Sequence, residues 1–386
     1  MILLEIVLAL FLSRILALLL DRVYVPGITS YILTGIILGP SLLGLITDVS
    51  PDMLVEFSII LLFFYSGLNV DFKGLRSYFK EAVVTTLSGA GITIALTLGV
   101  LSYLGLSPTA SLVVAVSIAN TATEVVVIML KYVGGLEDEF KRVLIMASFL
   151  DDLIAVGFIA VLRGAILGNY ASVMIEVAKL AAFMVSVLGL MYLFVRKLSK
   201  YIYPLIINWN YLLIVSSAIL FGLVYLALKT SVGEIYGAYV AGLTISLLRL
   251  VKDPTLVYNV RVEELVSRMT TVLEFFIVPV FFIFIGAKTD VGSIFTFTTG
   301  VVLGLAVTGK FLGASLPWLY RRELKYGGLM GLAMNVRGSL EPAVVLVALE
   351  RGFISPIIFT AVVSVSLITS ALIPLILKVL TQYVEV

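Results

Sequence analysis

The chain has 386 residues, of which 61% are hydrophobic and 13% charged, and its formal net charge is +2. This composition excludes a soluble globular protein, and the long continuous apolar runs exclude a transmembrane β-barrel, whose strands are short and alternate in polarity. The small net charge gives no indication of nucleic-acid binding, and the absence of Cys and His excludes disulfides and the commonest transition-metal ligand. We therefore expect an all-α polytopic membrane protein.

Apolar stretches predict thirteen transmembrane helices, at about 20 residues per crossing. The first stretch contains Glu5 and Arg14 and lacks a basic start and a cleavage site, so we interpret it as a retained helix and not as a secretory signal. Short polar loops join the stretches, and we expect a single transmembrane domain over 1–386 with no nucleotide-binding domain attached. The predicted helices lie near 2–20, 27–46, 53–70, 80–104, 108–131, 139–163, 171–195, 210–228, 232–250, 265–287, 291–319, 325–350 and 355–380.

The basic residues of the loops predict the orientation of the chain. Most Lys and Arg residues outside the apolar stretches lie in the odd-numbered connections and the C-terminal tail, for example Lys73, Arg196 and Arg322. Cytoplasmic loops carry an excess of such residues. We therefore expect a multi-pass protein of the plasma membrane, with its N-terminus outside and its C-terminus in the cytoplasm.

The fifth stretch, 108–131, contains a polar cluster at membrane depth. Ser, Thr and Asn side chains can satisfy backbone groups where a helix is interrupted, and such interruptions are tolerated beside a cavity. The cluster predicts either an interrupted helix beside an ion path or ordinary hydrogen bonding between helices. Its members are Ser117, Asn120, Thr121, Thr123 and Glu124.

The sixth stretch contains two adjacent acids, Asp151 and Asp152, which are the only charges between Val143 and Leu162. Inserting one charge at a helix centre costs about 2.5–3.5 kcal/mol, and charges at that depth usually face a water-filled path or a partner. The pair predicts an ion or proton route; the alternative is a structural carboxylate pair satisfied by neighbouring helices. The short loop before this stretch allows the polar cluster to lie level with both acids.

The eleventh stretch carries Lys310, the only charge between Asp290 and Arg321. A lone lysine at mid-span needs a counterion or must lose its proton. A carboxylate of the Asp151–Asp152 pair is the expected counterion.

The twelfth stretch combines Asn335, Arg337 and Glu341 with Gly338 and Pro342, and the last two predict an interrupted helix. Arg337 and Glu341 stand four residues apart and can pair within one helix. A broken polar helix beside a charged helix thus occurs in both halves of the chain, which is typical of inverted repeats around a transport site. We expect the fourth to sixth helices to correspond to the eleventh to thirteenth.

Four motifs appear in order along the chain: ITSYILTGIILGPSLLG near the N-terminus, LDD at 150–152, TGK at 308–310 and NVRG at 335–338. Together they resemble the monovalent cation:proton antiporter superfamily, in the branch of Kef-type carriers and paired-aspartate bacterial sodium/proton antiporters. The resemblance implies a homodimer of thirteen-helix chains, in which two discontinuous helices cross. It also implies a core domain (helices about 80–163 and 291–380) and a dimerisation domain (about 1–70 and 171–287).

The resemblance also implies roles for individual residues. Asp152 matches the acid that binds the cation or protons, and Asp151 matches the acid that pairs with Lys310. Thr121 matches a position lining the cation site, and we place Asn120 and Thr123 with it. We expect Asp152 and Asp151 to ligate Na⁺. We expect the charges around the crossing to be balanced by Lys310, Arg337, Glu341 and Glu124.

We expect a secondary active sodium/proton antiporter and not an enzyme, with no cofactor beyond the transported cation. Cation and proton would compete for one pair of acids, since neighbouring carboxylates resist ionising together. Two protons per Na⁺ would make the exchange electrogenic. The partners would be a monovalent cation, protons and the lipid bilayer. The alternatives are a potassium/proton antiporter or K⁺ efflux carrier and, more remotely, a sodium-coupled organic anion symporter with Arg337 as its anion-binding residue.

Overall fold

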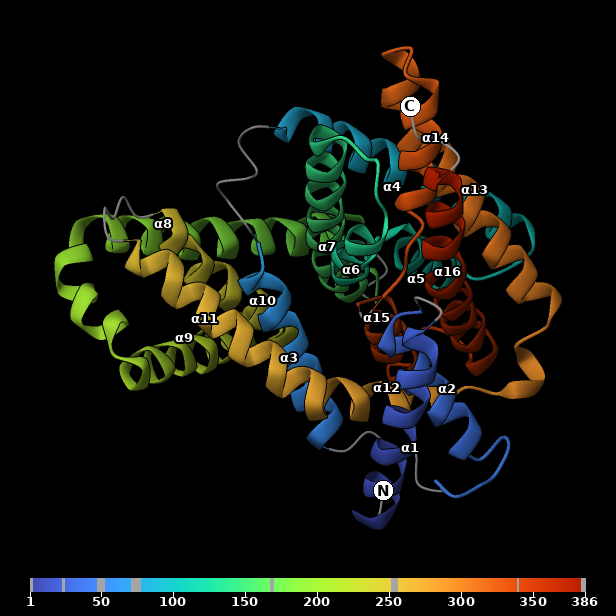
Figure 1. Cartoon of the computed structure of the whole chain (residues 1–386), viewed down its shortest axis with the longest axis horizontal. Coiled ribbons are helices and arrows are strands. Elements are labelled where there is room, and N and C mark those ends of the chain that lie inside the picture. The colour runs from blue at the N-terminus through green and yellow to red at the C-terminus, as the bar shows by residue number, and fades with distance from the viewer. Residues whose placement is uncertain are drawn as a thin grey trace. The chain divides into compact units, whose positions relative to one another are not determined.

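The computed structural model describes residues 3–22, 25–46, 53–70, 78–166, 170–250, 256–338 and 340–382, and the regular secondary structure in these ranges is entirely helical (Figure 1). The predicted all-α class is therefore confirmed. The α-helices are α1 Leu3–Asp21, α2 Gly27–Leu38, α3 Met53–Leu68, α4 Phe79–Tyr103, α5 Pro108–Ala119, α6 Thr123–Tyr132, α7 Asp138–Ile166, α8 Tyr170–Ile207, α9 Trp209–Lys229, α10 Glu234–Ser246, α11 Val257–Val272, α12 Val278–Ala287, α13 Phe297–Tyr320, α14 Leu324–Ala333, α15 Leu340–Glu350 and α16 Pro356–Gln382.

Each of the thirteen predicted segments corresponds to one helix or to a pair of helices. Three of the segments correspond to two α-helices each. The fifth is interrupted between α5 and α6 and the twelfth between α14 and α15, whereas in the tenth a π-helical turn, Leu273–Ile277, joins α11 to α12 without a break. α8 is longer than expected and continues through Ile207, because the basic residues after Val195 are good helix formers and do not end it.

Seven helical stretches among the described residues are long and apolar enough to cross a membrane. α2 and α3 are apolar but shorter. The seven stretches are Phe79–Tyr103, Pro108–Leu130, Met174–Leu193, Trp209–Lys229, Val257–Ala287, Phe297–Tyr320 and Pro356–Thr381.

The chain forms two compact units. Unit 1 comprises Met1–Pro51, Tyr78–Ala155 and Pro279–Val386, and unit 2 comprises Asp52–Ser77 and Val156–Val278. The predicted roles of core and dimerisation domain concern movement and assembly, which these packing units do not test, so that assignment stays a prediction.

In unit 1, α4 and α13 pack closely because small residues face each other. A Cβ on Gly309 would lie 2.8 Å from the Cα of Thr93, and one on Gly313 would lie 2.7 Å from the Cα of Gly89. Close backbone approach at glycines is characteristic of helix pairs in membranes. α2 and α12 also pack closely, because Gly35 lies directly against the backbone carbonyl group of Ile283. The glycine-rich motif near the N-terminus thus packs within its own chain.

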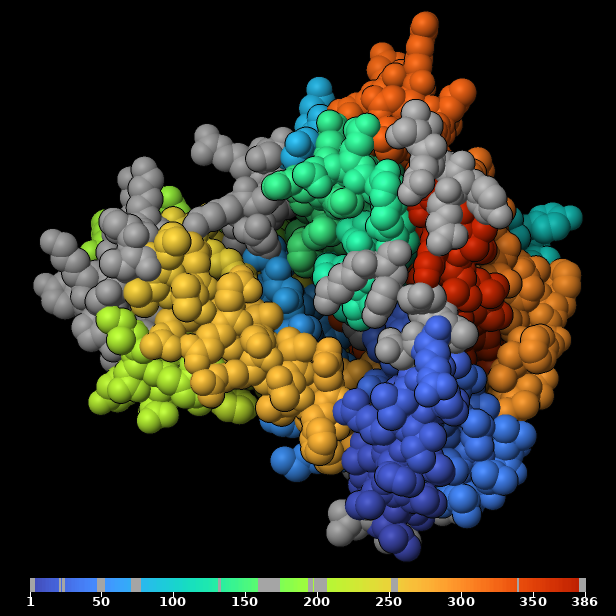
Figure 2. Space-filling view, in the orientation of Figure 1, coloured from blue at the N-terminus to red at the C-terminus, as the bar shows by residue number. Residues whose placement is uncertain are grey.

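Unit 2 is organised around a similar contact between α3 and α10. Gly242 of α10 rests on the carbonyl of Phe64, and Gly67 of α3 rests on the carbonyl of Tyr239. The buried Arg249 then donates to the carbonyl oxygen of Leu68 at 2.7 Å, which satisfies an acceptor at the end of α3. α9 and α11 lie at the surface (Figure 2); α9 carries many exposed apolar side chains, and α11 carries the exposed Val260 and Val272.

Candidate functional site

The site begins with the interruption of two helices in unit 1. α5 ends at Ala119, the backbone is extended at Asn120, and α6 begins at Thr123. α14 ends at Ala333 and α15 begins at Leu340. The predicted discontinuities are therefore present in both halves. Each half shows the same order of a continuous helix, a broken helix and a second continuous helix, with α4 to α7 corresponding to α13 to α16.

The two interruptions lie against each other. The amide of Ala122 donates to the carbonyl oxygen of Val336 at 3.0 Å, and the hydroxyl of Thr121 donates to the carbonyl oxygen of Met334 at 2.6 Å. Backbone groups that would otherwise lack partners at the helix ends are thereby satisfied across the crossing.

Arg337 closes the end of α5. Its side chain is completely buried, and Nη1 donates to the carbonyl oxygens of Ile118 and of Asn120, the latter at 2.7 Å. A cation at a helix C-terminus complements the negative end of the helix dipole. Nη1 also lies 3.4 Å from Oε1 of Glu341, which is the i, i+4 pairing predicted from the sequence. Arg337 therefore stabilises the crossing through protein acceptors.

Asp152 of α7 faces the broken segment between α5 and α6. The hydroxyl of Thr123 donates to Oδ2 of Asp152 at 2.9 Å, and Nδ2 of Asn120 donates to Oδ1 at 3.4 Å. Asp152 is 3% exposed. A carboxylate that is buried with few neutral donors is a strong candidate to bind a cation or a proton.

Asp151 lies beside Asp152 in the sequence but faces a different partner. Nζ of Lys310 lies 2.5 Å from Oδ2 of Asp151 and also donates to the carbonyl oxygen of Ala119 at 2.6 Å. Both side chains of the ion pair are almost completely buried. The contact expected from the sequence is therefore present, and the paired acids have different surroundings.

Two buried oxygen atoms near the acids accept no hydrogen bond from the described residues: Oδ1 of Asp151 and Oδ1 of Asn120. Na⁺ is a hard cation that prefers oxygen ligands, and these atoms and the carboxylate of Asp152 are ligands of that type. The described residues contain no group of three or more acidic residues arranged to hold a metal. A cation here would have to combine the two acids with neutral oxygen ligands.

The remaining predicted residues occupy distinct places. Glu124 in the first turn of α6 approaches the crossing, because a Cβ on Gly338 would lie 2.5 Å from its Oε1. Nδ2 of Asn335, just beyond the end of α14, donates to the carbonyl oxygen of Gly331 at 2.7 Å. Sequence reasoning missed Ser370 of α16, whose hydroxyl donates to the carbonyl oxygen of Arg337 at 2.5 Å. No motif points to Ser370, since a serine in an apolar helix usually bonds to its own backbone.

A model of the family described as "Sodium/hydrogen exchanger, transmembrane" matches residues 7–383. The chain belongs to this family. Among its relatives is the protein named probable Na⁺/H⁺ antiporter 3 of Methanocaldococcus jannaschii, which is 25% identical over 93% of this chain and 92% of the relative. Another is the protein named Na⁺/H⁺–K⁺ antiporter GerN of Bacillus cereus, which is 24% identical over 92% of this chain and 89% of the relative.

The fold of this family member is also similar to a solved structure. The sodium proton antiporter MjNhaP1 of M. jannaschii superposes with a TM-score of 0.72, covering 98% of this chain and 96% of that chain at 17% identity. The likeness thus extends over both halves of this chain. The predicted superfamily and the predicted fold class are both confirmed.

Proposed function

We propose that this protein is a secondary sodium/proton antiporter in which Na⁺ and protons bind alternately at Asp152. The observation that carries the proposal is the position of this carboxylate, which is buried at the crossing of two interrupted helices and held by Thr123 and Asn120. The family and the names of the relatives support it. The site cannot bind a cation and protons at the same time. Competition between them is therefore enough to couple their opposite fluxes.

The two acids have different roles in this mechanism. Asp152 carries the cation or the proton, and Asp151 keeps Lys310 at the site through the 2.5 Å ion pair. Arrival of Na⁺ beside Asp151 weakens that ion pair, and Lys310 then releases a proton. Two protons per Na⁺ would follow if both Asp152 and Lys310 take part, which would make the exchange electrogenic.

A K⁺/H⁺ exchange is the second candidate, because one relative is named an antiporter of both Na⁺ and K⁺. Sodium-coupled transport of an organic anion has less support. Arg337, the residue expected to bind such an anion, is fully buried and already donates to Ile118, Asn120 and Glu341. Its Nη1 is therefore occupied by protein acceptors, and the complete burial of the side chain leaves no exposed surface for a transported anion.

The test is cation-driven collapse of a pH gradient in proteoliposomes. Addition of Na⁺ should dissipate the gradient, and addition of a large organic cation such as N-methylglucamine should not. A response to K⁺ alone would favour the second candidate. If neither Na⁺ nor K⁺ dissipates the gradient, the antiport proposal is wrong. A change in rate with an imposed membrane potential would report net charge movement and hence an electrogenic exchange.

We also propose a plasma-membrane homodimer with its N-terminus outside and its C-terminus in the cytoplasm. The distribution of basic loop residues supports the orientation. The chain has no Cys, so a single Lys378→Cys substitution near the end of α16 provides a unique label. An impermeant maleimide that reacts in intact cells would contradict the cytoplasmic C-terminus. A monomeric mass by light scattering of the purified protein would contradict the dimer.

A further inference from the structure

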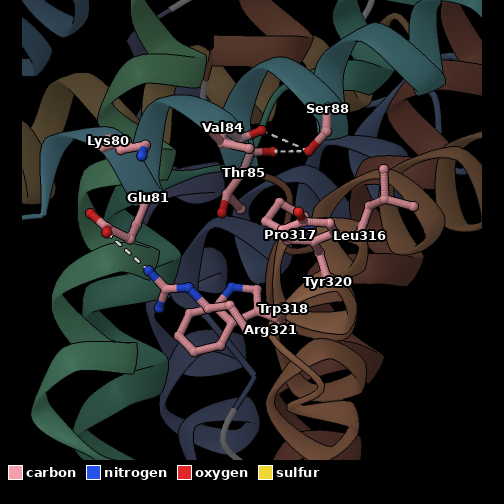
Figure 3. Close-up of a pocket in the computed structure, with 10 residues that line it drawn as sticks. All are labelled: Lys80, Glu81, Val84, Thr85, Ser88, Leu316, Pro317, Trp318, Tyr320 and Arg321. Atoms are coloured by element: carbon pink, nitrogen blue, oxygen red, sulfur yellow. Dashed lines mark hydrogen bonds and ion pairs between the residues drawn. The ribbon is translucent and has the colours of Figure 1, made fainter.

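A pocket lies in unit 1, away from the paired acids, where the beginning of α4 meets the end of α13 (Figure 3). Its volume is about 510 Å³. Residues of only these two segments line it. The lining residues are Lys80, Glu81, Val84, Thr85, Ser88, Leu316, Pro317, Trp318, Tyr320 and Arg321.

The charged groups of the pocket leave one cation available. Arg321 is held by two acids, with Nη2 lying 2.9 Å from Glu81 and Nη1 lying 3.0 Å from Glu139 of α7. Its guanidinium also lies 5.6 Å from the ring centroid of Trp318. Lys80 is exposed, and within the described part of the chain its ammonium group has no hydrogen-bond or ion-pair partner. Glu81 and Glu139 together balance the charges of Arg321 and Lys80, so among the described residues Lys80 is the one cation of the pocket that is free to contact a ligand.

A buried hydroxyl adds a second polar group. Thr85 lines the pocket one turn beyond Glu81, its side chain is completely buried, and its Oγ1 has no hydrogen-bond partner among the described residues. Buried polar groups are nearly always paired in folded proteins. An unpaired hydroxyl on the wall of a pocket that also presents an unpartnered lysine is suited to donate to an anionic oxygen.

The rest of the lining is apolar, and part of it is exposed. Leu316 is 54% exposed and Tyr320 is 93% exposed at the end of α13. Both helices are long enough to cross a membrane, so these side chains lie at the point where a spanning segment ends. Trp and Tyr are enriched at that level of the bilayer, where one side of the ring is apolar and the other is wet. The pocket thus combines a cationic polar end with a wall that can contact an acyl chain.

We propose that this pocket binds an anionic membrane lipid, with the headgroup phosphate contacting Lys80 and the hydroxyl of Thr85 and the acyl chain lying along Val84 and Leu316. Basic pockets between transmembrane helices on the cytoplasmic side commonly take such headgroups. This end of α13 is followed by Arg322 and Lys325, the basic cluster that the sequence assigns to the cytoplasmic side. The proposal does not depend on which ion is transported.

The pocket lies on the helix pair that carries Lys310. Gly89 is one turn beyond Thr85 on α4, and a Cβ on Gly89 would lie 3.5 Å from the side-chain carbons of Lys310. A lipid at the end of this pair therefore acts on helices that also position the ion pair. Removal of the lipid should therefore change the transport rate and leave the fold largely unchanged.

The test uses the fact that the chain has only two tryptophans, Trp209 and Trp318. A Trp209→Phe protein contains Trp318 of the pocket as its sole tryptophan. It is reconstituted in phosphatidylcholine vesicles that contain a small fraction of either brominated phosphatidylglycerol or brominated phosphatidylcholine. Bromine quenches the fluorescence of a nearby indole, so the proposal predicts stronger quenching by the anionic lipid at equal mole fraction. Equal quenching by the two lipids would overturn it.

Charge variants of the Trp209→Phe protein test where the anionic lipid binds. Lys80→Gln should lower the apparent affinity for brominated phosphatidylglycerol about fivefold, since a Lys at a membrane surface contributes attraction of that order. Lys325→Gln is the matched control, because Lys325 lies just beyond the same end of α13 but does not line the pocket. An equal loss in both variants would show general surface attraction and would contradict a defined site.

Inorganic phosphate separates a lipid site from a simple phosphate site. Millimolar phosphate should not relieve the quenching by brominated phosphatidylglycerol, because it lacks the acyl chain that the apolar wall contacts. Relief by phosphate at constant ionic strength would overturn the lipid assignment.

Discussion

The amide of Ala122 and the carbonyl oxygen of Val336 are joined by a 3.0 Å hydrogen bond, so the two interrupted helices meet backbone to backbone. This contact leaves little room, because a Cβ on Gly338 would overlap that of Ala122 and lie 2.5 Å from Oε1 of Glu124. The crossing is therefore tightly packed where the ion is proposed to bind.

Gly338→Ala should disrupt the crossing. The added methyl group must displace Ala122 or Glu124, and overpacking of this kind costs about 1–3 kcal/mol. We expect a lower melting temperature and a large loss of Na⁺/H⁺ exchange in proteoliposomes. Gly328→Ala is the control, since a Cβ there meets nothing within 4 Å. Equal activity of the two variants would show that the contact at Gly338 is unimportant.

Thr123→Val should weaken the proposed cation site. Valine keeps the shape of threonine but removes the hydroxyl that donates to Asp152 at 2.9 Å. A hydrogen bond to a charged group is worth about 1.5–3 kcal/mol, so the apparent KM for Na⁺ should rise at least about tenfold. Thr123→Ser keeps the donor and should retain a KM near that of the wild type. An unchanged KM in the valine variant would remove Thr123 from the site.

The ion pair between Lys310 and Asp151 should show strong coupling in a double-mutant cycle. Removing one partner of a buried pair leaves an uncompensated charge and costs about 3–5 kcal/mol. Lys310→Met and Asp151→Asn should therefore each lower the melting temperature, and the double variant should be more stable than the sum of the two predicts. Additive effects would contradict the coupling.

The partly exposed pair of Lys288 and Glu350 is the matched comparison. Such pairs contribute about 0–1 kcal/mol, so the same cycle there should show little coupling. Transport by Lys310→Met that no longer responds to membrane potential would connect Lys310 with the second proton.

The sequence was sufficient to predict the ion pair of Lys310, because a single lysine at mid-span has few possible counterions. Gly338 and Pro342 also predicted the interruption of the twelfth segment, whereas the polar residues of the fifth left ordinary hydrogen bonding between helices open until the family resemblance implied a second discontinuous helix. The sequence could not predict which polar side chains of the fifth segment face Asp152. Thr121 and Thr123 are chemically alike, and the extended backbone between them directs one to Met334 and the other to Asp152.

Backbone acceptors were the other feature that the sequence could not reveal. Lys310 donates to the carbonyl oxygen of Ala119, and Arg337 donates to those of Ile118 and Asn120. Every residue has a carbonyl group, so its availability depends on where the helix ends and not on residue identity. The side chains of Lys310 and Arg337 thus donate to the free carbonyl groups at the C-terminal end of α5, which explains why both are buried so deeply.

Gly242→Ala should destabilise unit 2. A Cβ on Gly242 would meet the carbonyl oxygen of Phe64 and lie 2.6 Å from the amide of Leu68, so α3 and α10 would have to separate. We expect a clear drop in melting temperature. Gly222→Ala in α9 has no neighbour within 4 Å and should leave stability unchanged or raise it by up to about 1 kcal/mol through helix propensity. Equal melting temperatures would contradict the close packing.

Asp152→Asn tests the proposed carrier itself. The amide nearly matches the carboxylate in size and can still accept a hydrogen bond from Thr123, so the protein should fold with a nearly unchanged melting temperature. The variant cannot exchange a proton for a cation, and we expect its flux to fall to that of protein-free liposomes. Asp138→Asn, in the first turn of the same helix, removes a carboxylate that is 87% exposed and should keep wild-type exchange. Retained exchange in Asp152→Asn would exclude this residue as the carrier, and loss of exchange in both variants would indicate that the assay reports helix stability instead of ion binding.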